Sequence, residues 1–139
     1  MPGIFVDTAG WGHLVDPTQA CHEQAATLYR RFRQQGFRLL TTNYILAELV
    51  ALLTSPLGIP RTKIIAFITG LKTSPYVDIL HVDATLDAQA WQLLVDRSDK
   101  DWSLVDCSSF VVMRQAGLIE ALTTDRNFEQ AGFVRLLKP

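Results

Sequence analysis

Short apolar runs alternate with segments of helical periodicity along the whole chain, and this alternation constrains the fold more than any other feature. Residues 4–6 form a first apolar run, and the segment 18–35 then places Ala25, Leu28 and Phe32 at helical spacing before Gly36. Strands that alternate with helices are joined by right-handed crossovers into a mostly parallel sheet with both faces covered. The sequence therefore predicts an α/β three-layer sandwich of about five strands flanked by helices.

The remaining elements follow in the same alternating order. We expect strands at 37–42 and 76–82, helices at 43–53, 61–71, 84–97 and 104–115, and short final strands at 119–124 and 133–137. Asn43 and Asp83 are the expected N-caps of two of these helices, and Gly117 is the expected stop of another.

Composition limits the class of protein. The 139 residues, 48% of them hydrophobic and 19% charged, fit one globular domain spanning residues 1–139. Thirteen Lys and Arg against fourteen Asp and Glu give a net charge of −1, so any contact with a nucleic acid must be local. Cys21 and Cys107 form neither a metal motif nor a disulfide framework, and no apolar run approaches the roughly 20 residues that span a bilayer. We expect a soluble, cytoplasmic protein without a membrane anchor.

Four acidic residues are placed where parallel strands end or where helices leave them. Asp7 follows the first strand and Asp125 follows the fourth, so both should lie at the carboxyl edge of the sheet. Glu48 is the only charge in "NYILAELVALL", and Asp106 lies near the start of the helix at 104–115. Carboxylates that converge in this way repel one another unless a cation neutralises them. A site built from oxygen ligands alone favours Mg²⁺ or Mn²⁺.

Each acid also has a purely structural interpretation. Asp7 can form an Asx-turn, Asp125 can cap the short helix "RNFEQA", and Asp106 can complete a capping box with Ser103. Glu48 lies too deep in its helix to act as a cap, and its helical neighbours predict a half-buried face. Glu48 is therefore the acid that most favours a functional site.

Other assignments remain open at this stage. Asp101 belongs either to a solvated loop or to the outer ligands of the same site. A phosphatase of the haloacid-dehalogenase type would also carry an aspartate after its first strand, but it needs a second one at position 9, which is Ala9. A response receiver needs a lysine after its last strand, and only Lys138 comes near.

Four segments resemble, in order, the motif blocks of the PIN-domain ribonucleases, and in particular the VapC-type toxins of toxin–antitoxin pairs. They are "FVDTAGW", "TTNYILAELVALL", "DKDWSLVDCSSFVVM" and "LTTDRNFEQAGF", and together they span nearly the whole chain. The resemblance implies a PIN-type sandwich and a ribonuclease that depends on Mg²⁺ or Mn²⁺. It places the metal-binding and catalytic acids at Asp7, Glu48, Asp106 and Asp125, with Thr124 as a secondary candidate.

The resemblance also implies partners: an RNA substrate, a cognate antitoxin and a second copy of the chain in a homodimer. Five basic residues are candidates for holding the RNA backbone, although each also fits an ordinary solvated helix face: Arg30, Arg31, Arg33, Arg61 and Lys63. Trp11 and Trp102 could stack on a base or pack in the core. A degenerate PIN module that binds RNA or protein without cutting is the alternative function, and the sequence does not name the RNA.

Overall fold

Five parallel strands form one sheet in the order β3-β2-β1-β4-β5, which places the first strand of the chain at the centre. The computed structural model describes residues 3–139. The strands are β1 (Gly3–Val6), β2 (Arg38–Thr42), β3 (Val77–Leu80), β4 (Glu120–Leu122) and β5 (Val134–Arg135). Phe5 of β1 is in register with Leu40 of β2 and with Ala121 of β4. The expected α/β class and the parallel sheet are confirmed.

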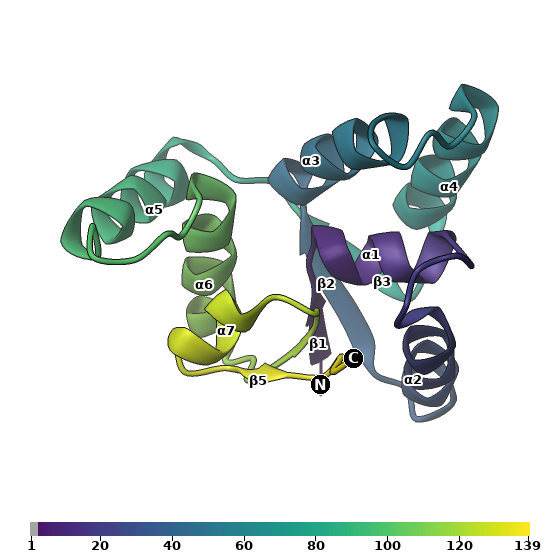
Figure 1. Ribbon diagram of the computed structural model, residues 1–139. Coiled ribbons are helices and arrows are strands. Elements are labelled where there is room, and N and C mark those ends of the chain that lie inside the picture. The colour runs from purple at the N-terminus through teal and green to yellow at the C-terminus, as the bar shows by residue number, and fades with distance from the viewer. Residues whose placement is uncertain (1–2) are drawn as a thin grey trace.

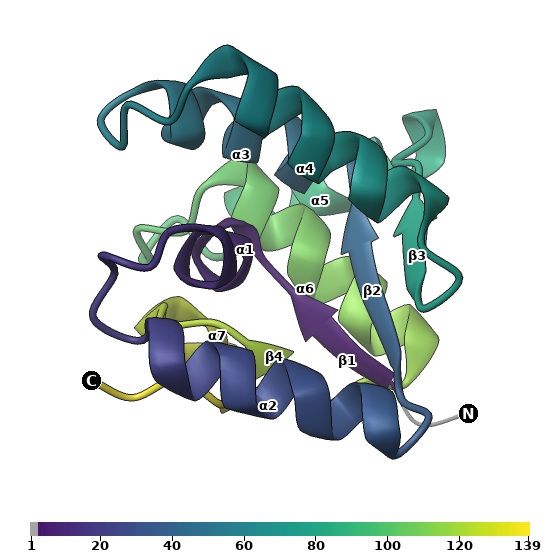
Figure 2. The same cartoon turned by 90° about the vertical axis from the view of Figure 1, so that its right-hand side faces the viewer.

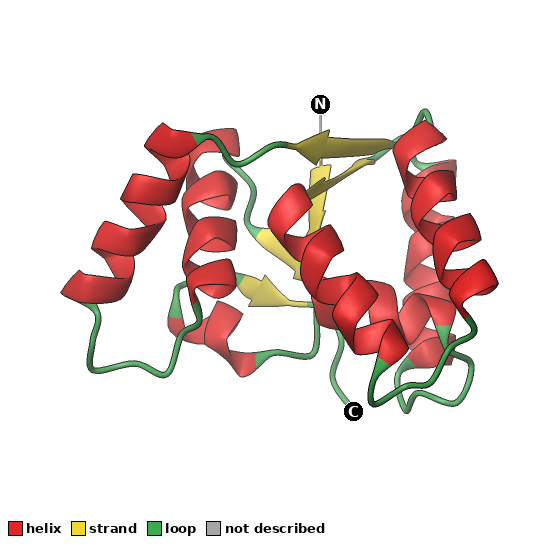
Figure 3. Cartoon of the chain, turned by 90° about the horizontal axis from the view of Figure 1, so that it is seen from above, coloured by secondary structure: helices red, strands yellow, loops and turns green. Residues whose placement is uncertain are grey.

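Helices cover both faces of this sheet. They are α1 (Thr8–Val15), α2 (His22–Gln34), α3 (Asn43–Thr54), α4 (Arg61–Thr73), α5 (Ala84–Asp96), α6 (Leu104–Ala116) and α7 (Arg126–Gln130). Helices α5, α6 and α7 lie on one side of the strands and α1 to α4 on the other (Figure 1), and the view from above shows the same layering (Figure 3). Figure 2 shows α1 between α2 and the pair formed by α3 and α4.

The first crossover contains a helix that the sequence pattern did not predict. Helix α1 begins directly after Asp7, whereas the first helix was expected only at 18–35, and α2 occupies 22–34 of that range. Two glycines in "TAGWGHLV" lower the helix propensity of α1, so the sequence pattern did not predict this helix. One of them is required by packing, because a Cβ on Gly10 would lie 2.0 Å from the backbone carbonyl oxygen of Leu122. Helix α1 therefore packs so closely against the end of β4 that position 10 has no room for a side chain.

Several predicted boundaries and one predicted cap need correction. The N-cap of α3 is Thr42, whose side chain accepts a hydrogen bond from the N–H of Ile45. Asn43 is instead the first helical residue, and its side chain accepts a hydrogen bond from the N–H of Val82, 2.7 Å away. The final strands β4 and β5 are shorter than expected. Among residues 3–139, no helix combines the length and the apolar character needed to cross a membrane.

Both tryptophans that flank motif acids belong to the core. The indole of Trp11 is 1% exposed and donates a hydrogen bond to the hydroxyl of Thr41. Trp102 is 5% exposed and packs edge-on against Phe110, at 5.0 Å between ring centroids. Neither ring face is open to stack on a base, so the core interpretation is right and the base-stacking one is wrong.

Candidate functional site

The carboxyl edge of the sheet brings together chain segments that are far apart in sequence. Asp7 follows β1, and Val6 is in register with Leu122 of β4, three residues before Asp125. Helices α1 and α7 begin at these two acids, which serve as their N-caps. The unpaired backbone N–H groups of a helix start favour negative charge, so this edge suits carboxylates.

Asp7 is the most buried of the four acids. Its side chain accepts hydrogen bonds from the N–H of Gly10 at 2.8 Å and from the hydroxyl of Thr123 at 2.6 Å. Burial, together with the negative charges of Asp125 and Asp106, raises the pKa of Asp7 to about 7, although both hydrogen bonds act in the opposite direction. The repulsion shows that acids 99 and 118 positions apart in sequence lie within electrostatic range of one another.

Thr123 links two of the acids. Its fully buried hydroxyl donates to Asp7 and accepts a hydrogen bond from the N–H of Asp125, at 2.9 Å. The sequence resemblance pointed to Thr124, whose backbone carbonyl accepts a hydrogen bond from Arg135. The signal for Thr123 was available: residues two apart in extended backbone face the same side, and Thr123 stands two residues before Asp125.

Asp106 combines a capping role with a position beside the other acids. One of its carboxylate oxygens, Oδ2, accepts hydrogen bonds from the N–H of Ser103 and from the side-chain amide of Asn127, both at 3.1 Å. The predicted capping box with Ser103 is confirmed. Burial and the charges of Asp125 and Glu48 raise the pKa of Asp106, while the hydrogen bonds from Ser103 and Asn127 lower it.

Glu48 is more exposed than its helical pattern predicted. The expected half-buried face is confirmed by its neighbours Tyr44 and Leu52, which are half-buried, but Glu48 itself is open to solvent on α3. Its carboxylate oxygen Oε1 accepts a hydrogen bond from the hydroxyl of Thr8, the residue that follows Asp7. Since Glu48 also acts on the pKa of Asp106, it lies at the solvent side of the same group of acids.

In the described part of the chain, three of the four acids keep one carboxylate oxygen without a hydrogen bond, whereas both oxygens of Asp7 accept one. Within residues 3–139, no hydrogen bond reaches Oδ1 of Asp106, Oδ2 of Asp125 or Oε2 of Glu48. No three His, Cys, Asp or Glu side chains of this range lie close enough together to hold a metal ion as they stand. The donors are nevertheless oxygen atoms of acids within electrostatic range, and this chemistry fits a hard divalent cation.

The five basic residues singled out in the sequence do not gather around the acids. The guanidinium of Arg33 lies 4.0 Å from the ring centroid of Tyr76, which precedes β3 at the amino edge of the sheet. The end of α2 is thus at the opposite edge from Asp7, and Arg61 and Lys63 begin α4 beyond the far end of α3. A basic residue that no sequence pattern indicated is close to the acids: Arg126 is exposed and directly follows Asp125.

Asp101 and Thr124 lie close in sequence to the acids, but their side chains form no hydrogen bond with these acids among residues 3–139. Asp101 is exposed in the loop before α6, five residues from Asp106, and Thr124 precedes Asp125 in half-buried backbone. No side-chain hydrogen bond joins either of them to the four acids among residues 3–139.

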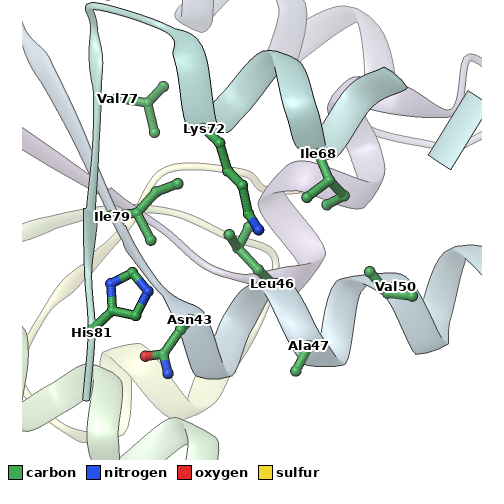
Figure 4. Close-up of a pocket in the computed structure, with 9 residues that line it drawn as sticks. All are labelled: Asn43, Leu46, Ala47, Val50, Ile68, Lys72, Val77, Ile79 and His81. Atoms are coloured by element: carbon green, nitrogen blue, oxygen red, sulfur yellow. The ribbon is translucent and has the colours of Figure 1, made fainter. Parts of the chain in front are cut away.

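Two apolar grooves lie beside the acids rather than over them. The larger, of about 620 Å³, is formed by α3, α4 and β3, with Lys72 reaching across it and His81 at the end of β3 (Figure 4). The smaller, of about 230 Å³, lies between α1, α2 and α4 and is lined by Trp11, Leu14, Ala26, Tyr29, Arg30, Phe67 and Leu71.

The comparison with known proteins decides the family. A model of the PIN domain matches residues 4–134. The chain belongs to the PIN-domain family. This PIN domain is 35% identical to the 23S rRNA-specific endonuclease VapC20 of Mycobacterium tuberculosis over 133 residues, which cover 96% of the chain and 97% of the relative.

Solved structures agree with that assignment. The crystal structure of M. tuberculosis VapC20, described as a toxin that cleaves the sarcin–ricin loop, superposes on this PIN domain with a TM-score of 0.86 and 33% identity, covering 97% of this chain and 99% of that one. FitAcB from Neisseria gonorrhoeae gives a TM-score of 0.64 at 20% identity, with 98% and 97% of the two chains covered. PAE2754 from Pyrobaculum aerophilum gives 0.63 at 16% identity, with 97% and 90% covered. The last two show a shared fold.

Proposed function

We propose that this PIN domain is a VapC-type toxin, an endoribonuclease that hydrolyses RNA phosphodiester bonds with the help of a divalent cation. The observation that carries the proposal is the buried carboxylate of Asp7, which lies at the carboxyl edge of the sheet with Asp125, and within electrostatic range of Asp106, acids from distant parts of the chain. Similarity to VapC20 over nearly the full length of both chains supports the same assignment. Residues 1–139 act as one domain in this proposal.

Four acids would hold the cation: Asp7, Glu48, Asp106 and Asp125. A bound Mg²⁺ or Mn²⁺ lowers the pKa of a coordinated water and neutralises charge on a phosphodiester. The chain's own contribution is to orient the ligands, through the hydroxyl of Thr123 on Asp7 and the hydroxyl of Thr8 on Glu48. Thr124 and Asp101 are secondary candidates that would act through water.

Basic groups near the acids would hold the RNA backbone. Arg126 is exposed, follows Asp125 and forms no ion pair within residues 3–139, so its guanidinium is available to a phosphate. Because VapC20 is named for its action on 23S rRNA, we propose ribosomal RNA as the substrate class. Such a substrate makes the cytoplasm the proposed site of action.

An antitoxin would occupy the smaller groove. Trp11 lies four residues after Asp7 on α1, about 6 Å along the helix axis at 1.5 Å per residue. An apolar helix in this groove would therefore bring its own side chains close to the acids, and an arginine from it could pair with them in place of the cation.

We also propose a homodimer, supported by exposed apolar side chains such as Trp91 and Val95 on α5.

Cleavage of a ribosomal RNA fragment tests the function. The purified protein is incubated with the labelled RNA in Mg²⁺, in Mn²⁺ and after removal of metal with EDTA, beside Asp7→Asn and the control Asp96→Asn, which changes an exposed acid at the end of α5. We expect cleavage by the wild type and the control in either metal, and none by Asp7→Asn or in EDTA. Cleavage that survives EDTA would refute the metal-dependent mechanism. RNA binding without cleavage in any metal would support the non-catalytic alternative.

A further inference from the structure

Asn127 stands between two of the four acids and contacts both. Its side-chain amide donates a hydrogen bond to Oδ2 of Asp106, and its backbone N–H donates one to Oδ1 of Asp125 at 2.9 Å. These acids come from different helices, since Asp106 lies in the first turn of α6 and Asp125 caps α7. Asn127 thus ties the start of α6 to the start of α7.

The side chain of Asn127 is not needed by its own helix. Its backbone supplies the hydrogen bonds of α7, through the N–H to Asp125 and through the carbonyl that accepts from the N–H of Ala131. Asparagine is a weaker helix former than alanine, so the amide contributes nothing to the stability of α7 by propensity. Within residues 3–139, the side-chain amide donates its hydrogen bond to the carboxylate of Asp106.

The amide also fixes which oxygen of Asp106 stays available. Oδ2 accepts two hydrogen bonds, from Ser103 and from Asn127, whereas Oδ1 receives none from residues 3–139. A carboxylate held by two donors on one oxygen has lost its rotational freedom, and its other oxygen keeps a fixed direction. Partners that orient a metal ligand in this way tune the affinity of the metal without touching it.

We propose that Asn127 is a positioning residue that holds the carboxylates of Asp106 and Asp125 in one arrangement for a divalent cation. This inference rests on the proposed metal site. It assigns the amide the role of a hydrogen-bond donor, and it excludes position 127 as a ligand.

Titration calorimetry with Mn²⁺ at one fixed pH, without RNA, measures the effect directly. The variant Asn127→Ala removes the donor, and the control Gln115→Ala removes a side-chain amide from the other end of α6, where it bonds only to Gln89 in the described chain. We expect the dissociation constant for Mn²⁺ to rise about 10- to 100-fold in Asn127→Ala and to stay unchanged in the control, with the Tm of both metal-free variants close to that of the wild type.

The isosteric variant Asn127→Asp tests whether residue 127 acts as a hydrogen-bond donor to Asp106 or as a ligand of the metal. It keeps the size of the side chain but replaces the amide donor with an acceptor, and Asn43→Asp serves as its control because it adds a charge while preserving the acceptor for Val82. We expect Asn127→Asp to bind Mn²⁺ at least as weakly as Asn127→Ala. Tighter binding than the wild type would overturn the inference, because position 127 would then act as a ligand.

A kinetic measurement distinguishes positioning from a general loss of structure. In Asn127→Ala, the Mn²⁺ concentration for half-maximal RNA cleavage should rise with the dissociation constant, whereas the rate at saturating Mn²⁺ should stay within about threefold of the wild type. Equal Mn²⁺ affinity of Asn127→Ala and wild type would overturn this inference and leave the metal site standing. A wild type that binds no Mn²⁺ would overturn both.

Discussion

Replacing Asp7 with asparagine should change how the stability of the metal-free protein depends on pH. Burial and neighbouring acids raise the pKa of Asp7 from 3.8 to about 7. Between these two values the unfolded chain has released a proton that the folded protein still holds, so the free energy of unfolding falls as the pH rises. At 1.36 kcal/mol per pKa unit, the loss from Asp7 amounts to at most about 4 kcal/mol, complete near neutral pH.

Asparagine carries no charge at any pH, so Asp7→Asn removes this loss. Its amide oxygen can still accept the hydrogen bond from Gly10, and its amide group can face the hydroxyl of Thr123. We therefore expect the variant to gain stability relative to the wild type steadily between pH 4 and pH 7, by up to about 4 kcal/mol, and to level off above that range.

Urea denaturation of metal-free protein, followed by circular dichroism at half-unit steps from pH 4 to pH 8, measures the difference directly. Asp101→Asn is the matched control, since Asp101 is exposed in a loop and its variant should follow the wild type at every pH. A difference between Asp7→Asn and wild type that does not vary with pH would refute the reasoning. Lower stability of the variant at neutral pH would mean that the capping of α1 by the carboxylate outweighs the cost of burying its charge.

Three further predictions test the packing and the acids. Gly10→Ala should unfold or destabilise the protein by more than about 3 kcal/mol, because its Cβ would meet a backbone carbonyl of β4, whereas Gly70→Ala in the open interior of α4 should stabilise it by about 0.5–1 kcal/mol in urea denaturation. Glu48→Gln should abolish RNA cleavage and the growth arrest on expression while the Tm stays within about 2 °C, because the side chain is exposed. Thr123→Val should raise the pKa of Asp7 further and cost about 1–3 kcal/mol of stability near neutral pH, since the buried carboxylate loses its hydroxyl donor; unchanged denaturation curves would contradict this.

The sequence predicted which edge of the sheet carries the acids. The position of Asp7 and Asp125 after parallel strands follows from strand order alone, and the capping roles of Asp106 and Asp125 follow from local spacing. The neutral residues Thr123 and Asn127 were not predicted as part of the site. Their hydroxyl and amide groups are recognised as partners of the acids only because the tertiary structure brings them to a carboxylate.

The misplaced basic candidates have a topological reason. Each crossover helix of a parallel sheet runs back from the carboxyl edge toward the amino edge, so the end of α2 lies at the edge opposite Asp7. Arg31 and Arg33 occupy that end, and their distance from the acids was therefore deducible from the strand order. Helix α1 was not deducible, because Gly10 is selected by close packing on β4 and lowers the local helix propensity at the same time.

The central place of β1 sets the moment at which this protein can first act during its synthesis. Asp7 emerges from the ribosome early, but Asp125, which follows β4, comes 118 positions later along the chain. At about 5–20 residues per second, the acids that must meet are made about 6–24 seconds apart. Throughout that interval β1 is not paired with β4, and Asp125 is not yet present beside Asp7 at the carboxyl edge of the sheet. A growing chain therefore carries no complete set of acids, and the ribosome that makes it works beside an inert polypeptide until β4 pairs with β1.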